Sequence, residues 1–162
     1  MADKEKLEEF KKDYFVLQKK YKLPGFEELN ISFDIERVAE KETDLPLREI
    51  RRTIADKIYL YLKFCEMILN PSSGAPMFMF SLLKNLTSND KRKVEEIYKR
   101  LGQLDIEIME LDLEYSEKKE VDFIKRINEE WKKFNKDLLS TIKLFKEPVD
   151  KPLDKNNKSY FG

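Results

Sequence analysis

The chain has 162 residues, of which 40% are charged, with 32 basic and 32 acidic side chains and no histidine. This length suits one ordinary domain, and a hydrophobic content of 41% excludes a disordered chain. The zero net charge argues against a general electrostatic attraction to nucleic acid or anionic lipid.

The first predicted helix covers residues 4–21, where apolar side chains recur in alternating steps of three and four. Its seam consists of Leu7, Phe10, Tyr14, Leu17 and Tyr21. Leu23-Pro24-Gly25 ends this helix, because proline disfavours helix in the residue before it. Residues 26–35 mix a helical spacing with a strand-like alternation. We predict a short helix followed by a loop up to Asp44.

The next long helix is expected to begin at Thr43 or Asp44, either of which can accept a hydrogen bond from the first-turn amides. Pro46 fits this first turn, since the amide hydrogen that it lacks would have no partner there. The apolar seam of this helix is Leu47, Ile50, Ile54, Ile58, Tyr61, Cys65 and Ile68. Asn-Pro-Ser-Ser-Gly at residues 70–74 ends it, and a short apolar helix is predicted over residues 76–86.

Two further long helices are predicted after Thr87-Ser88-Asn89-Asp90, which has the form of a capping box. The first has the seam Val94, Ile97, Leu101, Leu104, Ile108, Leu111 and Tyr115. Residues 104–115 also alternate with period two, but we predict helix because that alternation slips at residues 109–110 while the heptad continues. The last seam is Ile124, Ile127, Trp131, Phe134, Leu138, Ile142 and Phe145. Ser116 either caps a break between the two helices or lies within one bent rod.

The sequence therefore predicts an all-α fold, an antiparallel helical bundle of about four long helices plus one or two short ones. Four glycines and six prolines in the whole chain fit this class. We expect a single helical-bundle domain over residues 1–146 and a flexible polar tail over 147–162, where Pro148 and Pro152 end helical structure. One cysteine and no signal-peptide or membrane-spanning segment lead us to expect a cytoplasmic protein.

Little in the sequence points to catalysis. Histidine, the commonest general base and metal ligand, is absent, and no glycine-rich nucleotide-binding motif occurs. Cys65 lies on a predicted core seam, where it is expected to be a small core residue. We therefore favour a non-enzymatic protein with no cofactor and no bound metal.

A carboxylate-rich stretch over residues 105–122 is the one exception. Glu107-x-x-Glu110 and Glu117-x-x-Glu120 are similar in spacing to the Mg²⁺-binding motifs of all-α nucleotide pyrophosphohydrolases. An alternative function is therefore a Mg²⁺-dependent nucleotide hydrolase. Four carboxylates of this stretch, Asp105, Glu107, Asp112 and Glu114, fit flanking heptad positions that meet lysines of a neighbouring helix, and we favour this structural interpretation.

A second alternative concerns Arg48, Arg51 and Arg52, which share one helix face. Such a stripe can neutralise phosphates, so it indicates a nucleic-acid-associated helical protein. The favoured interpretation is again structural, namely a solvated face paired with the acidic first helix.

The favoured function comes from an excess of apolar surface. Ile106, Met109 and Leu113 form a second stripe on the side of their helix away from its seam, and the short segment with Met77 and Phe78 is apolar on most sides. Either these surfaces pack on one another, or part of them contacts a partner protein or a second copy. We predict a protein–protein interaction or assembly subunit with no membrane partner. Tyr160-Phe161, at the end of the tail, has the form of a docking peptide.

Overall fold

The computed structural model describes residues 4–71 and 76–150, which contain helices and no β-strand. The elements are α1 (Lys4–Tyr21), α2 (Phe26–Phe33), the 3₁₀ helix η1 (Ile35–Glu40), α3 (Pro46–Leu69), α4 (Met77–Leu83), α5 (Ser88–Leu113) and α6 (Glu117–Asp150). The predicted all-α helical bundle is confirmed. None of the helices in these ranges is long and apolar enough to cross a membrane.

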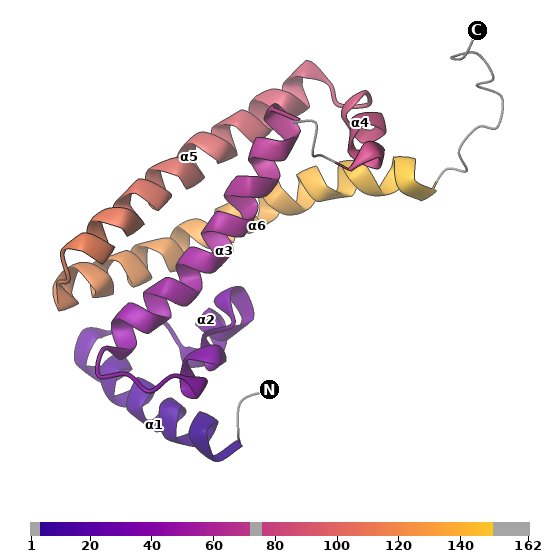
Figure 1. Ribbon diagram of the computed structural model, residues 1–162. Coiled ribbons are helices and arrows are strands. Elements are labelled where there is room, and N and C mark those ends of the chain that lie inside the picture. The colour runs from indigo at the N-terminus through magenta and orange to yellow at the C-terminus, as the bar shows by residue number, and fades with distance from the viewer. Residues whose placement is uncertain (1–3, 72–75, 151–162) are drawn as a thin grey trace, which may run out of the picture.

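Helices α3, α5 and α6 form the frame of the molecule, and each contacts the other two. α5 runs antiparallel to α3, and α6 turns back along α5 after a short loop (Figure 1). Most of their predicted seam residues supply the core, and Ile54, Leu104 and Ile127 are fully buried. Tyr115, predicted on the seam of α5, lies after the end of that helix and is exposed. The ring of Trp131 on α6 extends this core, with its centroid 5.1 Å from that of Phe33.

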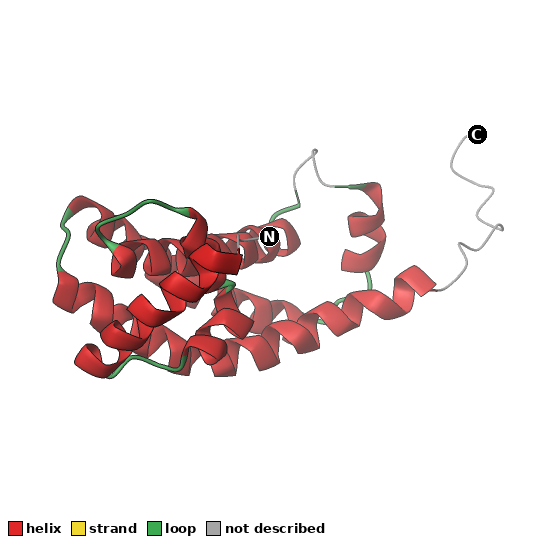
Figure 2. Ribbon diagram, turned by 90° about the horizontal axis from the view of Figure 1, so that it is seen from below, coloured by secondary structure: helices red, strands yellow, loops and turns green. Residues whose placement is uncertain are grey.

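The N-terminal elements α1, α2 and η1 gather at the end of the frame where α3 begins (Figure 1). The Tyr14 hydroxyl donates a hydrogen bond of 2.6 Å to the carbonyl of Pro24. The ring of Phe26 packs edge-on against Phe10 and Tyr14. These contacts join α1 to the turn that starts α2. At the other end, α4 lies against α6 and buries Met79 (Figure 2).

Local capping chemistry explains how α5 is bounded. Thr87 Oγ1 accepts a hydrogen bond from the amide of Asp90, and the Asp90 carboxylate accepts one from the amide of Thr87, so the predicted capping box is confirmed. α5 ends at Leu113, and α6 begins after Ser116, whose Oγ accepts from the Lys119 amide at 3.4 Å. The two helices are therefore separate and not one bent rod. Residues 104–113 are helical, as predicted.

Several predicted boundaries are wrong. The N-cap of α3 is Leu45, without a side-chain cap, and Thr43 Oγ1 accepts from the Leu45 amide instead. The predicted loop after α2 contains η1, and α4 is shorter than predicted. α6 does not end at Glu147 but continues through Pro148 to Asp150. Proline lacks the amide hydrogen that would bond the carbonyl four residues earlier, so α6 passes Pro148 with one backbone hydrogen bond fewer. The rest of the predicted tail, with Tyr160-Phe161, lies outside the described residues.

Candidate functional site

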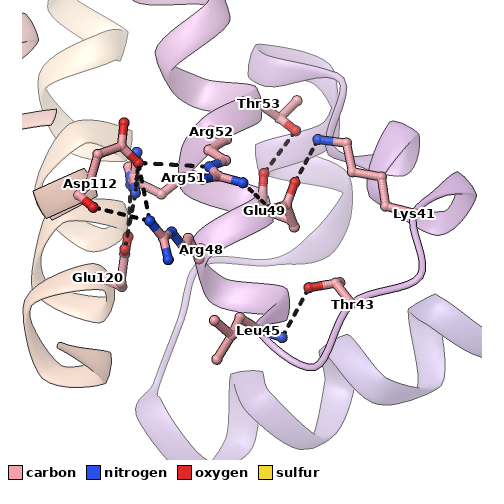
Figure 3. Close-up of polar contacts among 10 residues, drawn as sticks. All are labelled: Lys41, Thr43, Leu45, Arg48, Glu49, Arg51, Arg52, Thr53, Asp112 and Glu120. Carbon is pink, nitrogen blue, oxygen red and sulfur yellow. Dashed lines mark hydrogen bonds and ion pairs between the residues drawn. The ribbon is translucent and has the colours of Figure 1, made fainter. Parts of the chain in front are cut away.

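Arg51 lies at the centre of a buried charge network that connects α3 to α5 and α6 (Figure 3). Its side chain is fully buried, and so is that of Glu120 at the start of α6. Arg51 Nε donates to Glu120 Oε2 at 3.0 Å, and Nη2 donates to Asp112 Oδ1 at 2.8 Å. One guanidinium thus holds carboxylates from two helices at the point where the three frame helices meet.

Three arginine side chains of α3 contact Asp112 or lie within ion-pair distance of it. Besides Arg51, Arg48 Nη2 donates to the Asp112 backbone carbonyl at 3.1 Å, and Arg52 Nε lies 3.7 Å from Asp112 Oδ1. The hydrogen bond from Arg51 lowers the pKa of Asp112. Burial by itself would lower the pKa of Arg51, but hydrogen bonds to Glu120 and Asp112 raise it. The guanidinium therefore stays charged inside the protein.

The burial and the acidic partners of the three arginines define their role in the fold. Arg51 is buried, and both Arg48 and Arg52 lie within ion-pair distance of Asp112. Only Arg52 comes close to half exposure, at 46% of its side chain. The arginines pack α3 against α5 and do not line an open basic face. The sequence led us to expect acidic partners on the first helix. The partners observed are Asp112 of α5, Glu120 of α6 and, for Arg52, also Glu49 of α3 at 2.8 Å.

Two of the carboxylates considered for a metal site have structural partners. Glu107 forms an ion pair with Arg126 of α6, and Glu120 is held by Arg51. Among the residues that the structure describes, no group of three or more acidic or cysteine side chains is placed to hold a metal ion. Of the four carboxylates expected to meet lysines of a neighbouring helix, only Glu114 does so, through Lys119. Glu107 and Asp112 pair with arginines, and Asp105 has no ion pair in the described structure. Cys65 is buried, and burial raises the pKa of its thiol to about 11, which disfavours a nucleophilic thiolate at neutral pH.

The outer face of α5 carries the apolar stripe that the sequence predicts. The relative exposures of Ile106, Met109 and Leu113 are 61%, 55% and 90%. These side chains, called the α5 stripe below, lie on the opposite side of the helix from the buried seam residues Leu104 and Leu111. The alternative in which the stripe packs inside the bundle is therefore not observed.

Met77, the other described residue predicted to contact a partner, lies elsewhere. It is exposed on α4, which precedes α5 in the chain and packs against the second half of α6 (Figure 1). The 26 residues of α5 span about 39 Å, and Leu113 is the last of them. Met77 therefore lies far from the C-terminal part of the α5 stripe. The side chain of Phe78 is outside the described structure.

Gly102 lies on the same face of α5 as the α5 stripe, and sequence reasoning did not identify it. Residues 102, 106, 109 and 113 are spaced four, three and four apart, which places them along one face of a helix. A methyl group at Gly102 would meet nothing within 4 Å, so packing within the chain does not require glycine here. Extending the spacing of the α5 stripe by four residues toward the N-terminus would have found this position.

The fold and the site define the protein only as an all-α helical bundle with an exposed apolar stripe. Comparison of the chain with protein-family models, with curated proteins and with solved structures found no match.

Proposed function

We propose that this protein is a non-enzymatic interaction or assembly subunit and that its α5 stripe docks a helix of a partner. The observation that carries the proposal is the exposure of Ile106, Met109 and Leu113 along one helix face. Apolar side chains in steps of three and four accept a partner helix with the same spacing. Full burial contributes about 1.5–3 kcal/mol for each such side chain, which offsets part of the cost of association.

The frame behind the stripe supports the proposal, because it fixes the C-terminal half of α5. Asp112, next to Leu113, is held by Arg51 of α3, and Glu107, next to Ile106, is held by Arg126 of α6. A surface that is ordered before binding loses less conformational entropy when a partner arrives. The stripe is thus presented on a helix anchored from both sides.

The combined substitution Met109→Lys and Leu113→Lys tests this function. Both side chains are more than half exposed, so we expect unchanged helicity and thermal unfolding. We also expect the variant to lose a protein that the native chain captures from extracts of the cells that express it. Ile31→Lys is the matched control, because Ile31 is 83% exposed on α2, and it should retain that protein. Equal capture by all three chains would contradict the proposal, and unfolding of the double variant would assign both residues to the core.

A further inference from the structure

We propose that the helix bound by the α5 stripe is a basic amphipathic helix, with apolar residues in steps of three and four bordered by lysine or arginine. This inference rests on the proposed function and specifies the chemistry of its partner. It comes from the charged side chains that border the stripe.

Carboxylates border the α5 stripe on both sides. At 3.6 residues per turn, Asp105 and Glu110 fall about 70° to either side of the middle of the stripe. These are the positions that flank the seam between two packed helices, where the charge of the side chains selects the partner. The apolar contact is therefore lined by negative charge along both edges.

Asp105 and Glu110 are also available to a partner. Within the described residues, neither carboxylate has an ion pair or a hydrogen bond. The lysine and arginine that line the same surface hollow as Glu110 are already engaged, Lys119 by Glu114 at 2.9 Å and Arg126 by Glu107. The negative charge at the edges of the stripe is thus not neutralised within the described part of the chain.

A second copy of α5 is a poor occupant of this surface. In a parallel pair, Asp105 of one copy would lie near Glu110 of the other, and in an antiparallel pair each carboxylate would lie near its own equivalent. Both arrangements bring like charges together, which disfavours the complex. A helix with lysine or arginine at its flanking positions places opposite charges at both edges instead.

Two synthetic helical peptides with the same apolar face test the inference. One carries lysine and the other glutamate at the flanking positions, and each is titrated against the full chain by fluorescence anisotropy at low salt. We expect the lysine peptide to bind about tenfold more tightly, since several weak ion pairs add up, and the difference to shrink as salt increases. Combined Asp105→Lys and Glu110→Lys should reverse the preference. Combined Glu8→Lys and Asp13→Lys, which makes the same charge change on exposed positions of α1, should preserve it.

The possible results separate the two proposals. Equal affinities that are both lost with Met109→Lys and Leu113→Lys would keep the docking function and overturn the basic partner. Binding of neither peptide, or binding that this double variant does not weaken, would overturn both proposals. Sedimentation that shows a dimer of the native chain, dissociated by the same variant, would place a second copy on the stripe and overturn the basic partner.

Discussion

At the scale of single residues, Arg51 and Glu120 depend on each other. Removing two charges from water is costly, and their attraction compensates only when the geometry is good. The pair has such geometry, because Arg51 donates to both Glu120 oxygens, at 3.0 and 3.3 Å. Arg51 Nη1, however, has no hydrogen-bond partner within the described residues. Replacing one member of the pair should therefore lower the free energy of unfolding more than replacing both.

Glu120→Leu leaves the buried charge of Arg51 with only the partly exposed Asp112 as a partner. We expect the free energy of unfolding to fall by about 3–5 kcal/mol, as for other buried ion pairs that lose one member. Combining Glu120→Leu with Arg51→Met should cost less than Glu120→Leu alone, since no unpaired charge then stays buried, and Asp112 is 44% exposed to water. Urea unfolding followed by circular dichroism measures both. A double variant less stable than either single one would contradict this dependence.

At the scale of helices, the apolar seams were predictable and the buried arginine was not. The spacing of apolar residues records which face of a helix is buried, so the seams of α3, α5 and α6 could be read from the sequence. Arg51 lies beside the seam of α3, and its position is buried because both α5 and α6 contact α3. That arrangement depends on contacts between residues more than 60 positions apart, which leave no local pattern.

The spacing of the α5 stripe was predictable from the sequence, whereas its exposure to solvent was not. The spacing of Ile106, Met109 and Leu113 is a local property, so the stripe itself was predictable. Its exposure was not, because that depends on where α4 and α6 pack. From the sequence alone, the stripe could have packed against the short apolar segment. In the structure that segment, α4, lies against α6 instead.

The substitution Gly102→Ala tests the effect of a glycine in the interior of α5. Glycine inside a helix costs roughly 0.5–1 kcal/mol relative to alanine, and the added methyl group has free space in the isolated chain. We therefore expect a gain of about this size in the free energy of unfolding, measured with urea. If a partner helix approaches α5 closely at this position, the same methyl group will weaken its binding. A loss of stability would contradict the open surroundings of Gly102.

At the scale of the whole molecule, ion pairs join elements that lie far apart in the chain. A hydrogen bond from Lys132 of α6 lowers the pKa of Glu28 on α2. Burial by itself would raise the pKa of Glu49 on α3, but the hydrogen bonds and positive charges of Lys41 and Arg52 together outweigh it, and the pKa is lowered. The pKa of Asp112 is lowered as well, through Arg51. Since the chain has no histidine, carboxylates of this kind dominate its response to acid.

The stability of the protein should therefore be nearly constant around neutral pH and fall in acid. A carboxyl group whose pKa is lower in the folded than in the unfolded chain stabilises the fold above its unfolded pKa, and this stabilisation is lost as the pH falls through the folded pKa. We expect the free energy of unfolding to decline below about pH 5.

Asp112→Asn should lower stability at pH 7 and make the acid decline less steep, because one of the responsible groups is gone. Glu110→Gln, at a carboxylate without an ion pair in the described structure, is the control and should leave the decline unchanged. Thermal unfolding over a series of pH values measures these slopes, and an equally steep decline in the Asp112→Asn variant would show that the Arg51–Asp112 pair does not contribute to it.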